Sequence, residues 1–306
     1  MSVQPDLGTS TNAASLEAAE MGRRPGARDT LLFGFVPIGV LLGGAFFIPL
    51  SIMVLYSFWR MEGIRVVPDW TLFNYTNLFG SGVYARVLLK TFAISLLVTF
   101  LTIVAGYPFA YFLVRHTSPR WQQLLVALVI MPFWTSYLLR VYAWMGILGE
   151  RGLINLSLLS LGIIKAPLRF LLNNNYAVTL VFIYLYLPFA VITLYAAIQK
   201  FDFNQMLAAA DLGATPWQAF WEVLFPQTRQ GIATAFMFIF IPMLGEYITP
   251  KLVGGTDGIL ISNLIVNLFR GFQLTQGAAI AFAIVFLIVI LLVLGRRYLS
   301  IEELVP

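Results

Sequence analysis

The sequence predicts an all-α, polytopic membrane protein with six transmembrane helices, and two observations carry this prediction. The first is composition, because 59% of the 306 residues are hydrophobic and only 11% are charged. An average soluble domain carries about 25% charged residues, so a soluble globule of this size would lack the charge to cover its surface. The second observation is a set of six apolar segments, each close to the ~20 residues with which a helix crosses the hydrocarbon of a bilayer.

The six predicted spans belong to a membrane domain at residues 30–298, between a polar tail at 1–29 and a short C-terminal end at 299–306. In chain order they cover residues 31–58, 87–114, 124–148, 176–198, 232–248 and 278–294. The first span follows an arginine-rich stretch but is far longer than the ~7–15-residue core of a signal peptide. The fifth is the least regular, because prolines and a glycine interrupt its second half. An even number of spans places both termini on one side of the membrane.

The charges next to helix ends indicate which side that is. Total counts of Lys and Arg on the two sides are nearly equal and do not decide the orientation. The pair Arg296–Arg297 and the short loop between Arg115 and Arg120 abut predicted helix ends, where basic residues weigh most. The sequence therefore predicts that both termini lie in the cytoplasm.

Composition also excludes several kinds of function. Cysteine is absent and there is one histidine, so thiolate chemistry and a cysteine- or histidine-rich metal centre are excluded. The basic residues are spread along the chain rather than concentrated in a stripe, which argues against nucleic-acid binding. There is no G-x-x-x-x-G-K-[ST] phosphate loop, so the chain is not expected to hydrolyse ATP itself.

The loop at residues 199–231, on the same side as the N-terminus, is predicted to contain two short helices. Its first helix has one apolar stripe at i, i+3, i+4 and i+7 spacing, formed by Phe203, Met206, Leu207 and Ala210. Gly213 then supplies the residue that ends such a helix in a left-handed conformation.

The second helix of this loop has a complete start signal. Thr215 is a good N-cap, Pro216 suits the first helical position, and Gln218 is the partner of a capping box. Pro226 is expected to stop this helix. A pair of amphipathic helices exposed on one membrane face is typical of a docking element.

The string LAAADLGATPWQAFWEVLFP in this loop resembles the EAA signature, Glu-Ala-Ala-x3-Gly-x9-Ile-x-Leu-Pro, of permease subunits of ABC-type importers. Four positions match in register, Ala208, Ala209, Gly213 and Pro226, whereas Leu207 occupies the glutamate position. In that family the loop sits in a groove of a cytoplasmic ATPase. The resemblance therefore assigns coupling to the ATPase to Leu207, Ala208, Ala209, Asp211, Gly213, Ala214 and Pro226.

Two further segments, MPFWTSYLLRVYAWMGILGERGLIN and IPMLGEYITPKLVGG, resemble the polyamine (spermidine/putrescine) branch of these permeases. The resemblance implies the type I ABC importer permease fold in a bacterial inner membrane. It also implies three kinds of partner: a second permease subunit, two copies of an ATPase that bind ATP and Mg²⁺, and a periplasmic solute-binding protein. The implied solute is a polyamine or a related small polar solute such as an opine or an amino-acid derivative.

Two charged residues inside predicted spans mark a candidate solute pathway. A charge at mid-membrane costs roughly 2.5–3.5 kcal/mol on insertion scales, so Arg140 and Glu246 are expected to face a cavity or a partner. Trp134 and Tyr137 share a helical face near Arg140, and Tyr247 follows Glu246. The alternative stays open that the aromatic residues form an interfacial belt and that Glu246 caps a helix.

Two other functions also remain open from the sequence. An ion-coupled secondary transporter would need buried acidic residues or inverted repeats, and ionisable groups within the predicted spans are scarce. An intramembrane enzyme would need paired acidic or histidine residues on helices, whereas the one histidine, His116, lies in a predicted loop.

Overall fold

The computed structural model describes residues 27–295. The predicted C-terminal end at 299–306 and nearly all of the tail at 1–29 lie outside these described residues, as does the Arg296–Arg297 pair. The chain divides into two compact units, Met1–Leu55 and Tyr56–Pro306.

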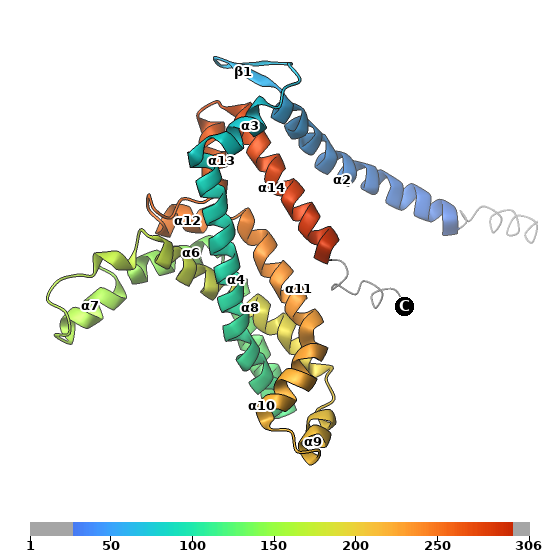
Figure 1. Ribbon diagram of the computed structural model, residues 1–306, viewed down its shortest axis with the longest axis vertical. Helices are drawn as coiled ribbons and strands as arrows, with labels where there is room; N and C mark the ends of the chain where they lie inside the picture. The colour runs from blue at the N-terminus through green and yellow to red at the C-terminus, as the bar shows by residue number, and fades with distance from the viewer. Residues whose placement is uncertain (1–26, 296–306) are drawn as a thin grey trace, which may run out of the picture. The chain divides into compact units, whose positions relative to one another are not determined.

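The described chain is mostly helical, as the sequence predicts (Figure 1). Its elements are α2 (Ala27–Phe58), β1 (Arg60–Glu62), β2 (Arg65–Val67), α3 (Phe73–Gly80), α4 (Gly82–His116), α5 (Pro119–Ile130), α6 (Tyr137–Leu148), α7 (Leu153–Ser160), α8 (Asn175–Gln199), α9 (Asn204–Asp211), α10 (Pro216–Ala219), α11 (Phe225–Leu244), α12 (Ile248–Val253), α13 (Ile261–Arg270) and α14 (Leu274–Gly295).

Helices α4, α8 and α11 lie side by side at the centre of the second unit (Figure 1). Helix α4 approaches α8 closely because Gly106 has no side chain, and a Cβ there would lie 3.0 Å from the Cβ of Ala190. Gly231 of α11 has the same role, because a Cβ at that position would overlap the Cβ of Ala197 in α8. Fully buried apolar side chains fill the space between these helices, among them Val98, Ala110, Phe182, Leu194 and Ile239.

The segment predicted as the third span, 124–148, contains two helices rather than one. A 3₁₀ turn, Met131–Trp134, separates α5 from α6, and the arms on either side of the break are bent by 91°. Pro132 in this turn has no N–H to donate, and Thr135 then takes an extended backbone with ψ 145°. The structure therefore corrects the expectation of one continuous helix, and the bend aims α6 toward α12 and α8.

The fifth predicted span, 232–248, overlaps only the second part of α11, which ends at Leu244 with Gly245 as its C-cap. The expectation that Pro226 stops the second loop helix is also corrected. A π-helical segment, Phe220–Leu224, joins α10 to α11, and Pro226 lies in the first turn of α11. Proline is tolerated there because a first-turn N–H has no partner within the helix.

Four described helices, α2, α4, α8 and α14, are long and apolar enough to cross a membrane, and the bent segment containing α5 and α6 makes five if it counts as one span. Helix α11 is not among them, and its first turns carry the polar residues Gln227, Arg229 and Gln230. Six spans therefore remain a prediction.

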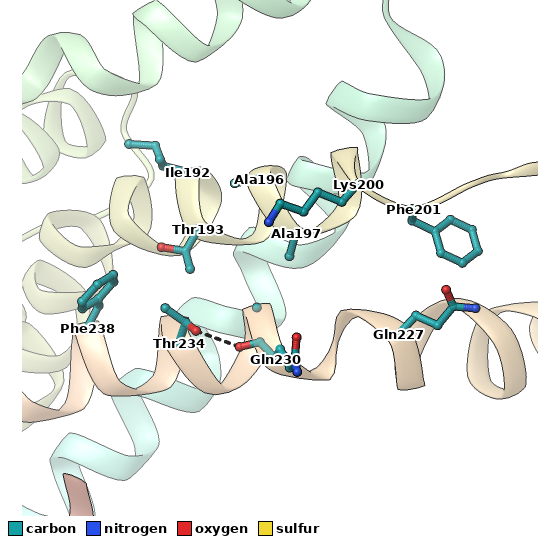
Figure 2. A pocket seen from close by; sticks show the side chains of 11 residues that line it. Ile192, Thr193, Ala196, Ala197, Lys200, Phe201, Gln227, Gln230, Thr234 and Phe238 are labelled. Atoms are coloured by element: carbon teal, nitrogen blue, oxygen red, sulfur yellow. Dashed lines mark hydrogen bonds between the residues drawn. The ribbon is translucent and has the colours of Figure 1, made fainter. Parts of the chain in front are cut away.

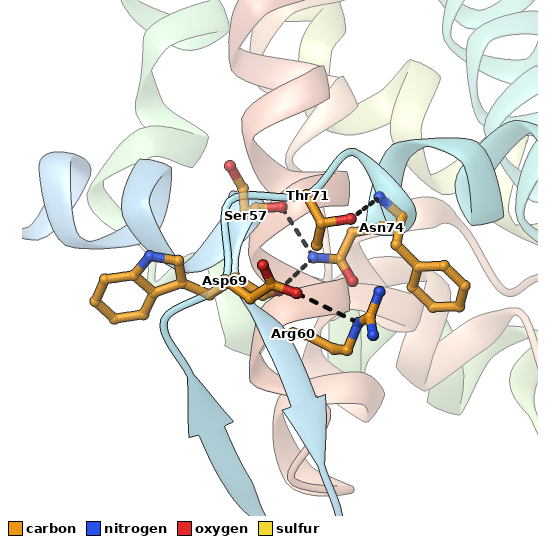
Figure 3. A network of polar contacts seen from close by, with 7 residues as sticks. Ser57, Arg60, Asp69, Thr71 and Asn74 are labelled. Atoms are coloured by element: carbon orange, nitrogen blue, oxygen red, sulfur yellow. Dashed lines mark hydrogen bonds and ion pairs between the residues drawn. The ribbon is translucent and has the colours of Figure 1, made fainter.

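A short antiparallel hairpin, β1–β2, departs from the all-α expectation, and it turns at Gly63 with φ +63°. Polar contacts near the hairpin join α3 to the residues just before β1, and β1 to the residues just after β2 (Figure 3). The side-chain amide of Asn74 donates to the carbonyl oxygens of Ser57 (2.9 Å) and Trp59 (2.8 Å). Arg60 on β1 forms an ion pair of 4.0 Å with Asp69.

Candidate functional site

The described residues contain two candidate sites at different ends of the α4–α8–α11 group. The first is the segment that contains α9 and α10, here called the coupling segment (residues 199–231). Its first helix ends as the sequence predicts, at Gly213 with φ +91°. The N–H of Gly213 donates to the carbonyl of Ala210 (2.9 Å), and the N–H of Ala214 donates to that of Ala209 (3.0 Å). This is a Schellman motif, and it uses two of the residues that match the family signature, Ala209 and Gly213.

The start of α10 forms the predicted capping box. The hydroxyl oxygen of Thr215 accepts from the N–H of Gln218 (3.3 Å), and the side-chain oxygen of Gln218 accepts from the N–H of Thr215 (2.8 Å). Pro216 occupies the first helical turn. Because both motifs are local, the turn between α9 and α10 has a conformation that its own sequence dictates.

Aromatic contacts attach the coupling segment to α4. Phe203, just before α9, lies under the Arg115 guanidinium at 5.1 Å and beside Tyr111, with ring centroids 6.1 Å apart. Phe220 meets Tyr107 edge to face at 5.7 Å. The Tyr107 hydroxyl is also hydrogen-bonded to the Thr228 hydroxyl (2.8 Å). These contacts join the residues around α9 and α10 to α4.

The opposite face of the coupling segment is apolar and exposed. Leu207, at the signature's glutamate position, is 53% exposed, and Leu212 and Trp217 are 90% and 70% exposed. Ala208 and Asp211 are exposed as well, whereas Ala209 and Ala214 are partly covered. The predicted apolar stripe thus divides, because Phe203 and Met206 turn toward the protein while Leu207 and Ala210 turn away.

The second site is a cavity of about 500 Å³ between α6, α8 and α11. It contains three of the five predicted pathway residues, Tyr137, Arg140 and Glu246, although these are far apart in the sequence. The remaining lining residues are Phe133, Leu185, Tyr186, Phe189, Phe238 and Pro242.

Glu246 lies in the break between α11 and α12 and has two kinds of contact. Its Oε1 atom accepts from the N–H groups of Ile248 (3.0 Å) and Thr249 (3.4 Å), which caps α12. Its side chain also lines the cavity together with Tyr137 and Tyr186. The capping role that the sequence left open is therefore present in the same residue that lines the cavity.

Arg140 enters the cavity from α6 across two aromatic rings. Its guanidinium carbon lies 5.6 Å from the ring centroid of Phe133 and 5.8 Å from that of Tyr137. The Nε atom is buried and has no hydrogen-bond partner among the described residues. The Tyr137 hydroxyl is hydrogen-bonded to the Thr249 hydroxyl (2.5 Å), which joins α6 to α12.

The structure does not bring the other two predicted pathway residues to this cavity. Trp134 is 84% exposed. The Tyr247 hydroxyl accepts from the Lys251 ammonium (2.6 Å) rather than lining the cavity. The sequence analysis did not assign Tyr186 and Phe189 to the solute pathway. The one local feature that could have indicated them is the neighbouring Pro188, which lies inside α8.

Comparison with known proteins assigns the chain to a family. The model of the binding-protein-dependent transport system inner membrane component matches residues 102–301, more than half of the chain. The chain belongs to this family. It is a permease subunit, a transport component of an importer that depends on a binding protein, and the match includes both candidate sites.

The permease is similar to several curated transport subunits. It is 39% identical over 199 residues to the spermidine/putrescine transport system permease protein PotB of Haemophilus influenzae, covering 65% of this chain and 68% of the relative. It is 35% identical over 235 residues to PotB of Escherichia coli, covering 77% and 80% of the two chains. It is also 32% identical over 242 residues to the inner membrane ABC transporter permease protein YdcU of Escherichia coli, covering 76% of each.

Among solved structures, a chain of a bacterial alginate ABC transporter in complex with an alginate pentasaccharide-bound periplasmic protein has a similar fold. The TM-score is 0.63 at 17% identity, and the match covers 96% of the permease and 98% of that chain. At this identity the likeness shows the fold alone, which is that of an ABC importer permease.

Proposed function

We propose that this permease forms one half of the solute pathway of an ATP-driven importer for polyamines such as spermidine and putrescine. The observation that carries the proposal is the 500 Å³ cavity, in which aromatic side chains from three helices surround the carboxylate of Glu246. The identity to the two PotB proteins supports the same solute class.

The cavity suits the passage of an organic ammonium group. Faces of Phe and Tyr rings attract a cation by about 0.5–2 kcal/mol each, depending on desolvation. Glu246 adds one charge-assisted acceptor, and Arg140 offsets it with one positive charge. Because the charges of Glu246 and Arg140 nearly cancel, the site binds a cation weakly. Transport requires weak binding, since a solute must leave as readily as it enters.

A second solute class is supported by Arg140. Its buried Nε atom has no partner among the described residues, and a carboxylate entering the cavity would supply one. An opine or an amino-acid derivative carries both an ammonium and a carboxylate, and could place them on Glu246 and Arg140. The relative uptake of a diamine and an amino acid of similar length separates the two classes.

The energy for transport comes, in this proposal, from outside the chain. Two copies of a cytoplasmic ATPase, which bind ATP and Mg²⁺, dock on the exposed apolar face of the coupling segment and on its equivalent in a second permease subunit. Because Phe203 and Phe220 pack against α4, closure of the ATPases would move the helix group as a rigid body. The periplasmic solute-binding protein delivers the solute on the opposite side.

The proposed membrane arrangement is that of the type I importer permease. Six spans cross the bacterial inner membrane, with the bent α5–α6 segment and α11 as the third and fifth, and both termini are cytoplasmic. Arg115 supports this orientation, since it lies beside the coupling segment and marks that end as the cytoplasmic one.

The test is uptake of radiolabelled putrescine by the complete transporter, with its partner subunits, in proteoliposomes. We expect uptake that needs ATP and the binding protein and that persists when ionophores remove ion gradients. Uptake that continues without ATP, and stops when the gradient is removed, would contradict the proposal in favour of an ion-coupled carrier. Uptake of the amino acid and not of the diamine would reassign the solute.

A further inference from the structure

A second cavity, of about 560 Å³, lies between the C-terminal half of α8 and the first half of α11 (Figure 2). Figure 2 shows Phe238 at one end of this cavity and Phe201 at the other. Its lining is more polar than that of the aromatic cavity, since it contains Thr193, Lys200, Gln227, Gln230 and Thr234.

The two cavities follow the same faces of the same two helices. On α8 the lining residues of both recur every three or four positions: Leu185, Tyr186, Phe189, Ile192, Thr193, Ala196, Ala197 and Lys200. At 1.5 Å per residue, the stripe from Tyr186 to Lys200 is about 21 Å long, most of the thickness of a bilayer's hydrocarbon. On α11 the corresponding stripe runs from Gln227 to Pro242.

Phe238 is the residue that lines both cavities. It lies between the polar stretch of α11 and the break near Glu246, and its side chain is 57% exposed within this chain. An aromatic side chain that projects from the helix pair, with a cavity on each side, divides the space along the stripe.

The second cavity is polar at the end nearest the coupling segment. Gln227 and Gln230 are among the residues that lower the apolar character of α11, and both line this cavity. Both residues also belong to the coupling segment, so in the proposed arrangement this end of the cavity faces the cytoplasm.

We propose that the two cavities are successive compartments of one solute track and that Phe238 is the side chain that separates them. The inference rests on the proposed function and adds a second, inner solute site to it. Hydroxyl and amide oxygens of Thr193, Thr234 and Gln230 would accept hydrogen bonds from an ammonium group there. Lys200 at the far end would repel the same cation, which favours its release.

The first test is the leak of radiolabelled putrescine from preloaded proteoliposomes that contain the complete transporter and no ATP. We expect Phe238→Ala to raise the leak about tenfold, equivalent to about 1.4 kcal/mol off the barrier, and to lower the uptake per ATP hydrolysed. Phe238→Leu, which keeps most of the side-chain volume, should raise the leak less than Phe238→Ala does. Phe238→Trp should slow uptake without adding leak.

A matched control is Phe286→Ala on α14. Phe286 is also 57% exposed but lines an apolar groove away from the track, so its truncation should leave the leak unchanged. Both substitutions remove an exposed ring, so neither is expected to prevent folding. An unchanged leak and unchanged uptake per ATP in Phe238→Ala, with uptake intact in the unmodified transporter, would overturn the inference.

A second test needs no knowledge of the solute, and it separates failure of the inference from failure of the proposed function. The chain contains no cysteine, so Thr234→Cys introduces a single thiol into the inner compartment. A membrane-impermeant thiol reagent should modify it from one side of the membrane only, and from both sides once Phe238→Ala is added. Mass measurement of this chain reads the result, and one-sided labelling in the double variant would contradict the division at Phe238.

Discussion

The coupling segment and the aromatic cavity differ in how their residues are assembled. The coupling segment is contiguous, and its Schellman motif and capping box close within a few residues of each other. The cavity combines α6, α8 and α11 across about a hundred positions, from Phe133 to Glu246. The first region therefore owes its shape to local sequence, and the second owes its shape to packing.

The two regions also differ in what they leave exposed. The coupling segment presents apolar side chains such as Leu212 and Trp217 to the outside, which is typical of a surface that another protein covers. The cavity instead holds one acid and one base, Glu246 and Arg140, among aromatic rings. In the proposed function one region binds the ATPase and the other contacts solute, so substitutions in the two should have separable effects.

The largest effect is expected from Glu246→Gln. Loss of a charge-assisted partner costs about 1.5–3 kcal/mol, so putrescine uptake should fall about 10- to 100-fold. The amide oxygen of glutamine can still accept from the N–H of Ile248, so α12 and ATPase binding should be preserved. Glu150→Gln, at an exposed carboxylate outside the cavity, is the control and should have no effect. Full uptake by Glu246→Gln would remove this residue from the pathway.

Trp217→Ala should have the next largest effect, which falls on the affinity of the ATPase rather than on the solute pathway. Aromatic residues at the centre of an interface often contribute about 2 kcal/mol, so the affinity of the ATPase should fall about 30-fold. The measurement is ATPase binding to the permease pair in detergent. Trp70→Ala is a matched control, because Trp70 is 71% exposed and Trp217 is 70% exposed, and Trp70 lies outside the coupling segment. Equal binding by both variants would show that α10 is not part of the docking surface.

Gly213→Ala should weaken ATPase binding less. A Cβ at Gly213 meets no atom within 4 Å, so the cost comes from the backbone at φ +91° and is about 1–2 kcal/mol. Gly213→Asn should lose less, because asparagine tolerates the left-handed region better. If alanine and asparagine weaken binding equally, the Schellman turn is not the reason for glycine at this position.

The smallest effect is expected from Tyr107→Phe, which removes the hydrogen bond to Thr228. A neutral hydrogen bond contributes about 1 kcal/mol, so the thermal midpoint of the purified permease should fall by a few degrees. Coupling between ATP hydrolysis and uptake should weaken slightly for the same reason. Tyr176→Phe, at a tyrosine that is 86% exposed, is expected to change neither. An unchanged midpoint in Tyr107→Phe would mean that the contacts of Phe203 and Phe220, and not this hydrogen bond, attach the segment.

The same contrast explains how much could be predicted from the sequence. The turn at Gly213 and the cap at Thr215 were predictable because their chemistry is local. The break between α5 and α6 was not, since an apolar run of residues conceals Pro132 and the extended Thr135. Tyr186 and Phe189 could not be assigned to the cavity, because only the packing of α8 against α6 and α11 decides which face of a uniformly apolar helix lines it.

At Pro226 the sequence predicted the end of a helix where the structure has the start of one. Pro226 was expected to end a helix, but it lies in the first turn of α11, where its missing N–H has no consequence. Composition predicted six apolar spans, of which four or five pass as membrane helices, but it did not show where the chain bends, because mean hydropathy averages over the residues that decide a bend.

The most direct test of the division between the two regions is the simultaneous measurement of ATP hydrolysis and putrescine uptake in the same proteoliposomes. Glu246→Gln and Trp217→Ala are compared with the unmodified transporter at equal permease content. We predict that Glu246→Gln lowers uptake while the ATPase stays bound and hydrolyses ATP at its basal rate. Trp217→Ala should lower hydrolysis and uptake in the same proportion. Proportional loss of both activities in Glu246→Gln, or full activity in Trp217→Ala, would contradict the division.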